Sequence, residues 1–125
     1  MSALRGLLGR LAKPPEEIRA EHLREWASSI PGAVALADME PRQRARVAGV
    51  VRNIRIDPRE GQGFIEATVT DGTGTLVARW LGRSSLSGVK LGVGLVMEGI
   101  AAAGDDDELV ILNPEYELIL APEHG

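Results

Sequence analysis

The chain of 125 residues is 44% hydrophobic, so it is long enough for one domain with a core and short for two. The absence of cysteine excludes disulfides, thiolate metal sites and cysteine nucleophiles, and Glu98 interrupts the apolar run that comes nearest to the length of a membrane span. The net charge of -4 conceals a basic first half, because residues 1–60 hold 11 lysines and arginines against 8 acids and the remainder hold 3 against 10.

Residues 1–32 are predicted to form a helical extension. Four leucines follow the spacing of one helix face: Leu4, Leu7, Leu8 and Leu11. Pro15 starts a second helix, whose first turn is acidic as the helix dipole favours, and Pro31 ends it. The apolar face of this second helix is predicted to consist of Ile18, His22, Trp26 and Ile30. The first residues lack the apolar core and cleavage site of a secretory signal, so we expect a cytoplasmic protein with no membrane partner.

The residues that follow, 33–120, show the alternation that is typical of β-strands. Strands are predicted at 43–56, 64–70, 75–81, 95–102 and 108–112, the last resuming at 115–120 after Asn113 and Pro114. Gly49 lies in the middle of the first run and predicts a β-bulge where a long strand bends. This pattern predicts a mainly β fold, a five-stranded Greek-key barrel of the OB type, with a flexible tail at 121–125.

The segment DGTG, residues 71–74, has two candidate roles, a phosphate-binding loop or a turn. A nucleotide-hydrolase loop requires a lysine and a hydroxyl residue after its last glycine, and neither follows Gly74 at that spacing. A dinucleotide loop must open a helix, whereas Thr75 to Trp80 is rich in strand-forming residues. The segment is therefore predicted to form the turn of a β-hairpin.

Four segments carry a resemblance to a known family: VAGVV (47–51), VTDGTGTLVARWLGR (69–83), VKLGVGLVMEG (89–99) and LNPEYELI (112–119). They resemble the OB-fold nucleic-acid-binding family, and within it the wedge domain of RecG-type DNA helicases. The resemblance covers about residues 33–120. It implies a stand-alone binding module, because the chain has no helicase motor motif. It also implies that nucleic acid crosses strands two and three, between the loops that follow strands one and four.

The resemblance implies a set of site residues on the outer face of the barrel. Strands one and three are expected to provide a basic groove, formed by Arg44, Arg46, Arg52 and Arg79. Two further arginines, Arg55 and Arg59, are expected in the loop after strand one. Phe64 is the expected base-stacking platform, with Glu66 and Thr68 on its face of strand two, while Trp80 points into the core. Arginine suits such a groove because its planar guanidinium binds phosphate and stacks on bases.

Two features argue for weak binding. Phe64 is the one plausible stacking platform, and each stacked base contributes on the order of 1 to 3 kcal/mol. The acidic run GDDDE, residues 104–108, is expected at the edge of the groove, where it would repel phosphate. As a metal site this run lacks the spacing of a calcium loop, and His22 and His124 form no base–nucleophile pair. No catalytic residue, metal or cofactor is predicted.

Two functions remain open from the sequence. The first is a non-enzymatic protein that binds single-stranded nucleic acid weakly, DNA in preference to RNA, in DNA repair or recombination; the preference for DNA rests on the resemblance. The second is a protein-interaction module, in which the N-terminal helices or the acidic second half of the barrel binds a protein partner. The arginine-rich first strand favours nucleic acid, and the net negative charge favours a protein.

Overall fold

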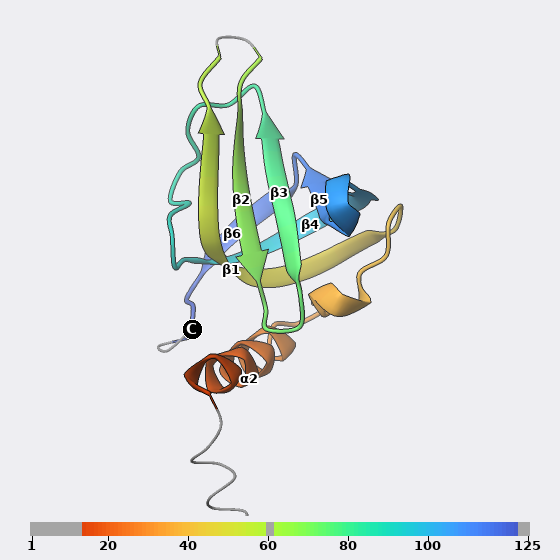
Figure 1. Ribbon diagram of the computed structural model, residues 1–125, viewed down its shortest axis with the longest axis vertical. Helices are drawn as coiled ribbons and strands as arrows, with labels where there is room; N and C mark the ends of the chain where they lie inside the picture. The colour runs from red at the N-terminus through yellow and green to blue at the C-terminus, as the bar shows by residue number, and fades with distance from the viewer. Residues whose placement is uncertain (1–13, 60–61, 123–125) are drawn as a thin grey trace, which may run out of the picture.

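The computed structural model describes residues 14–59 and 62–122 (Figure 1). One helix, α2 (Pro15–Ser28), precedes six strands: β1 (Arg44–Asp57), β2 (Phe64–Thr70), β3 (Thr75–Leu81), β4 (Gly94–Ala103), β5 (Leu109–Leu112) and β6 (Glu115–Ile119). Two short 3-10 helices, η1 (Leu36–Asp38) and η2 (Asp105–Asp107), lie in the connections. The predicted strands are confirmed, and no boundary is shifted by more than one residue. The predicted leucine-faced helix at Leu4–Leu11 lies outside the described residues.

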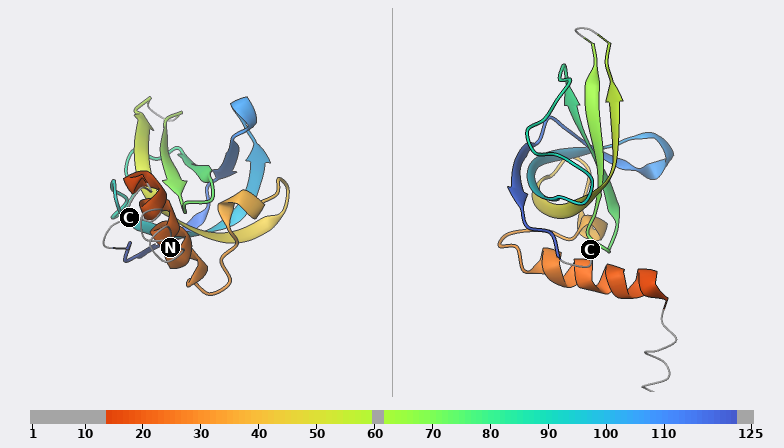
Figure 2. Two further views of the ribbon diagram at one scale, coloured as in Figure 1. Left: turned by 60° about the horizontal axis from the view of Figure 1, so that its bottom comes forward. Right: turned by 90° about the vertical axis from the view of Figure 1, so that its left-hand side faces the viewer.

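Five of the strands form a ring. The strand β1 pairs with β4 through its first half and with β2 through its second half, and both pairings are antiparallel. The ring continues from β2 to β3, then through a parallel pairing to β5, and returns to β4. The strand β6 continues along β4 after β5, as the predicted resumption past Pro114 requires. Figure 2 shows the strands curving around a common interior. The mainly β class with a helix before the strands is confirmed.

The core consists of the inward-facing residues of these strands. The inward residues predicted for the second and third strands are buried, Ile65, Ala67 and Val69 in β2 and Leu76, Ala78 and Trp80 in β3. Glu66 and Val77, which were predicted to face outward, are buried as well. The indole Nε1 of Trp80 donates a hydrogen bond of 3.1 Å to the carbonyl oxygen of Pro114. Trp80 is therefore a core residue whose single polar group is satisfied, and it is not a stacking platform.

The bend of β1 differs from the prediction. Pairing of β1 with β4 is regular through Gly49, and the register of β1 against β2 shifts between Val51 and Asn53. The bulge therefore lies at Arg52 and not at Gly49. Gly49 has a different role, because a Cβ there would lie 3.0 Å from the Cβ of Val69 where β1 crosses β2. The extra residue inverts the alternation that follows, so that Arg55 faces outward within β1.

The helix α2 covers the outer side of β1 and β4 below the β2–β3 turn (Figure 1). Its buried residues are Leu23 and Ala27, and Trp26 and Ile30 pack beside Ala27 against the strands. The predicted face was wrong in its first half, since Ile18 and His22 are exposed. Residues four apart drift by about 40° around a helix at each step, so a row of such residues cannot stay on one face. No helix in the described part of the chain has the length and apolarity needed to cross a membrane.

The DGTG segment is the β2–β3 turn, as predicted, and it also fixes that turn to η1. The side chain of Asp71 is fully buried. Its Oδ2 accepts a hydrogen bond of 2.9 Å from the amide of Leu36, and its Oδ1 accepts bonds from the amides of Thr73 (2.8 Å) and Gly74 (3.2 Å). The hydroxyl of Thr73 donates a further bond of 2.6 Å to the same Oδ1. Asp71 therefore holds two distant segments together, a role that its place in a turn did not indicate.

Candidate nucleic-acid interface

The centre of the candidate interface is a row of charged residues across three strands. Glu66 of β2 pairs in register with Arg55 of β1 on one side and with Arg79 of β3 on the other. Each arginine uses its own carboxylate oxygen: Nε of Arg55 lies 3.0 Å from Oε1 of Glu66, and Nε of Arg79 lies 2.6 Å from Oε2. Nη2 of Arg79 binds the same Oε2. One carboxylate thus fixes the position of two guanidinium groups.

Phe64 lies two residues before Glu66 and faces the same side of the sheet. The guanidinium carbons of Arg55 and Arg79 each lie over its ring, 5.1 Å from the ring centroid. These distances are within the range of cation–π attraction. We name Arg55, Phe64, Glu66 and Arg79 the Phe64 cluster. It presents one aromatic ring and two planar cations on a single face of the barrel.

The charges of this cluster are maintained at neutral pH. Burial raises the pKa of the Glu66 carboxyl, but hydrogen bonds and positive charge from Arg55 and Arg79 lower it by more, so the net pKa lies below its ordinary value. The pKa of Arg55 is raised, first by its hydrogen bond to Glu66 and then by the charge of Glu66, with smaller contributions from Asp57 and Glu108. The cluster therefore carries two positive charges and one negative charge.

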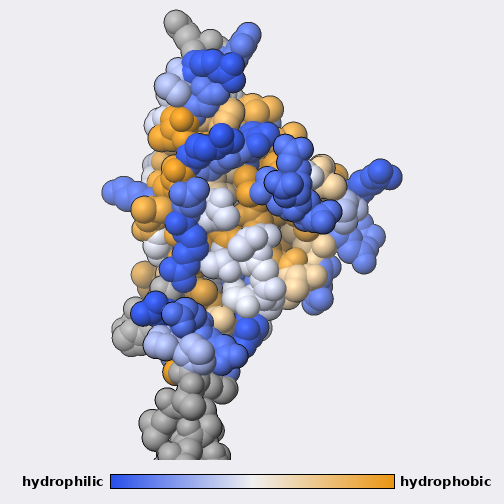
Figure 3. Space-filling model, viewed as in Figure 1, coloured by the Kyte–Doolittle hydropathy of each residue, from blue (hydrophilic) through white to orange (hydrophobic). Residues whose placement is uncertain are grey.

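Apolar and polar residues surround the cluster on the same face. Leu81 pairs with Phe64, and Leu112 of β5 pairs with Arg79; both leucines are half exposed. Thr68 lies beyond Glu66 on β2 and pairs with Val77. Figure 3 shows hydrophilic side chains over these strands with hydrophobic surface beside them. The face can accept planar apolar groups next to its charges.

Arg44 and Arg46 belong to another part of the barrel. They lie in the half of β1 that pairs with β4, and both contact the Glu98 carboxylate, at 3.4 and 3.5 Å. Glu115 of β6 lies opposite Glu98, so their surroundings are acidic. The structure thus separates these two arginines from the Phe64 cluster, and the single basic groove implied by the resemblance is wrong in this respect. The bend of β1 is the reason, because it turns the two halves of one strand onto different sides of the barrel.

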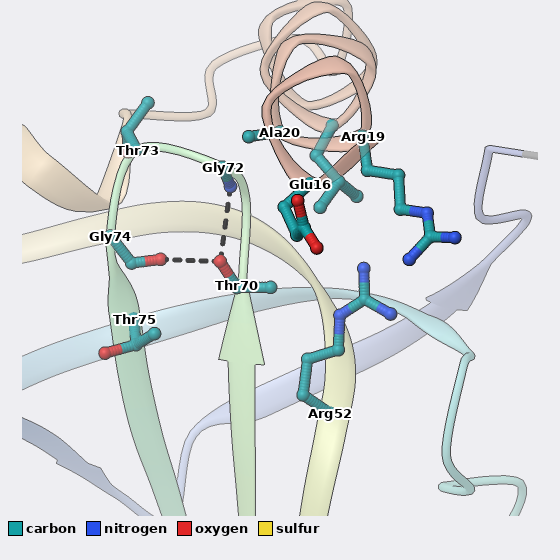
Figure 4. A pocket seen from close by; sticks show the side chains of 10 residues that line it. Glu16, Arg19, Ala20, Arg52, Thr70, Gly72, Thr73, Gly74 and Thr75 are labelled. Atoms are coloured by element: carbon teal, nitrogen blue, oxygen red, sulfur yellow. Dashed lines mark hydrogen bonds between the residues drawn. The ribbon is translucent and has the colours of Figure 1, made fainter. Parts of the chain in front are cut away.

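Arg52 and Arg59 occupy the two ends of the face. The bulge directs Arg52 into a cleft of about 500 Å³ between α2 and the β2–β3 turn, where Glu16 and Arg19 also point (Figure 4). Arg59 folds back onto the Asp57 carboxylate at 2.8 Å, and this hydrogen bond is the main cause of the lowered pKa of Asp57. Of the eight predicted site residues, the structure brings Arg55, Phe64, Thr68 and Arg79 together on one face.

Two features of the site differ from the sequence-based interpretation. Arg55 lies within β1 and not in the loop after it, since the strand extends to Asp57. Glu66 was predicted to lie on this face but was given no function, although its pairing with Arg79 could have been predicted from the turn. The pairing of Thr70 with Thr75 across the turn sets Glu66 opposite Arg79. Among the described residues, no group of three or more histidines and acids has the arrangement of a metal site.

Comparisons with known proteins identify the fold. No protein-family model matches the sequence, and no curated protein sequence matches it significantly. Among solved structures, the OB domain of a Methanosarcina mazei protein is similar, with a TM-score of 0.60 and 18% identity over 77% of this chain and 92% of that one. The chain has an OB fold. The fold inferred from the sequence resemblance is therefore confirmed.

Other structures with this OB fold have different ligands. RecG bound to a three-way DNA junction matches with a TM-score of 0.53 and 14% identity over 74% of this chain. The match spans 13% of the RecG chain. An OBody bound to hen egg-white lysozyme matches with a TM-score of 0.55 and 15% identity over 74% of this chain and 97% of that one. One of these proteins is bound to DNA and the other to a protein, so the OB fold alone does not choose between the two ligand classes.

Proposed function

We propose that this OB-fold protein binds single-stranded nucleic acid weakly, DNA in preference to RNA, through the outer face of β1, β2 and β3. The observation that carries the proposal is the Phe64 cluster, in which two guanidinium groups lie over one aromatic ring. Guanidinium groups and aromatic rings are the groups on which unpaired bases stack. In this proposal the protein is a binding module and not an enzyme.

The proposed affinity is low for two reasons. The cluster contains one aromatic ring, so stacking contributes on the order of 1 to 3 kcal/mol per base at a single position. Glu108, the last residue of the acidic run GDDDE, makes a small contribution to the raised pKa of Arg55, so one acid of this run acts on the cluster. A cytoplasmic role in DNA repair or recombination is part of the proposal and is supported by the resemblance to RecG-type proteins.

The test is a titration of a labelled single-stranded oligonucleotide at low salt, followed by fluorescence anisotropy. Phe64→Ala and Arg79→Ala are expected to lower the affinity by about 5-fold to 150-fold, the range that corresponds to the loss of one stacked base. Arg46→Ala is the matched control, because Arg46 lies on the β4 side of the barrel. Equal losses in Arg46→Ala and Arg79→Ala would assign the binding to charge in general and not to this face.

A protein ligand is the second candidate, and it is favoured by the half-exposed Leu81 and Leu112 beside Phe64. Aromatic and aliphatic residues at the centre of a polar face are common in protein interfaces. The OBody supports this candidate, because it is an OB fold bound to a protein. Leu81→Ser and Leu112→Ser should then weaken a protein complex and leave the affinity for oligonucleotides unchanged.

A further inference from the structure

Glu66 lies where it competes with phosphate for both arginines of the Phe64 cluster. Its Oε1 is bound by Arg55 and its Oε2 by Arg79, so both oxygens are occupied. The Glu66 side chain is 11% exposed, so its carboxylate is largely shielded from bulk water. A phosphate that approached the Nε–Nη2 edge of either guanidinium, the edge suited to bidentate binding, would have to replace a carboxylate oxygen already in place.

Glu66 does not compete in the same way with a base that stacks on the cluster. The ion pairs with Glu66 use N–H groups, which lie in the guanidinium plane, so these ion pairs do not themselves block stacking on a guanidinium face. The Arg55 side chain is 63% exposed, so it is accessible to a ligand. A base that stacks on Arg55 or on Phe64 leaves both ion pairs intact. Glu66 therefore disfavours phosphate contacts at this cluster and leaves base contacts possible.

We infer that Glu66 makes this face selective for unpaired bases over phosphate, and hence for single strands over duplexes. The inference rests on the proposed function and identifies Glu66 as the residue that determines which form of nucleic acid is bound. A duplex keeps the faces of its bases inside the helical stack and presents its phosphates outward, so it offers the cluster the group that Glu66 disfavours. A single strand can turn its bases outward.

The chain contains a matched control for this inference. Glu98 also contacts two arginines, Arg44 and Arg46, but at 3.4 and 3.5 Å, and its side chain is 37% exposed. The aromatic contacts of arginine found in the described residues are at Phe64, not at this patch. Glu66→Gln and Glu98→Gln therefore remove the same charge from two sites, one inside and one outside the proposed interface.

The experiment compares a single-stranded oligonucleotide with its duplex, for the wild-type protein and both variants, over a series of salt concentrations. Glu66→Gln should raise the affinity for the duplex more than for the single strand. It should also steepen the log–log salt dependence for the single strand by up to about 1.4, which is two phosphate contacts at about 0.7 each. Glu98→Gln should change neither quantity. An unchanged ratio of affinities and an unchanged slope in folded Glu66→Gln would overturn the inference.

A second measurement uses the wild-type protein alone and does not depend on the folding of a variant. An oligonucleotide with a central abasic tract keeps its phosphates and loses the bases that can stack. Its affinity should be at least about tenfold lower than that of the intact strand, a change within the range for one or two stacked bases. Equal affinities would overturn the inference while leaving nucleic-acid binding intact. Absence of saturable binding to the intact strand would overturn the proposed function as well.

Discussion

Replacing Asp71 by asparagine should destabilise the protein severely, because four hydrogen bonds meet on one buried carboxylate. The change is isosteric, but it replaces one oxygen by an NH2 group and removes the charge. If the remaining oxygen keeps its place beside Thr73 and Gly74, the new NH2 faces the amide of Leu36, so two donors oppose each other where a 2.9 Å hydrogen bond existed. A hydrogen bond to a charged group contributes about 1.5 to 3 kcal/mol, and a buried donor left without a partner costs about 1 to 3 kcal/mol.

The expected loss for Asp71→Asn is therefore about 2.5 to 6 kcal/mol in the free energy of unfolding, obtained by urea denaturation followed by circular dichroism. The matched control is Asp38→Asn in η1, where the aspartate is exposed and its side chain makes no hydrogen bond with any residue that the structure describes. This control should change the stability by less than about 0.5 kcal/mol. A loss of similar size in both variants, or a loss below about 0.5 kcal/mol in Asp71→Asn, would refute the role assigned to Asp71.

Three further predictions concern the interface. Glu66 has a lowered pKa in the folded state. The stability that it contributes is therefore complete above the unfolded pKa of about 4.3 and is lost as the pH falls through the folded pKa. Glu66→Gln should remove this part of the pH dependence of stability in acid-unfolding titrations. Replacing residues 105–107 with asparagine should raise oligonucleotide affinity at low salt, and the gain should vanish near 1 M salt, where the Debye length is about 3 Å; a gain that persists there would contradict an electrostatic cause. Arg46→Ala should leave the salt slope for oligonucleotide binding unchanged, and a slope reduced by about 0.7 would place a phosphate contact on the β4 side of the barrel.

The strands could be predicted from the sequence because their signals are local. Alternating residues such as Ile65, Ala67 and Val69 determine which face of β2 is buried, and the DGTG turn determines how β2 meets β3. The same two signals were sufficient to place Phe64 and Arg79 on one outer face. Each depends on residues that are close in the sequence.

The position of Arg44 and Arg46 could not be predicted in this way. Alternation correctly gives both side chains an outward direction, but it does not state which strand lies beside each half of β1. The neighbour of each half depends on where β1 bends. The sequence predicted the bulge at Gly49, whereas the extra residue lies at Arg52. A basic stretch that is continuous along the chain is therefore divided in space. The role of Asp71 was missed for a similar reason, since its partner Leu36 lies in a segment without a regular pattern.

The ring of strands is least extensively joined where it closes. Residues 77–79 of β3 pair with 110–112 of β5 in the parallel orientation, and residues 109–111 of β5 pair with 101–103 of β4, whereas β2 and β3 pair along their full lengths. Parallel pairing is slightly less stable per residue than antiparallel pairing. Local opening of the barrel should therefore begin at β5. Arg79 and Leu112 lie on this seam, so the edge of the proposed interface coincides with the part of the barrel that opens at the lowest free-energy cost.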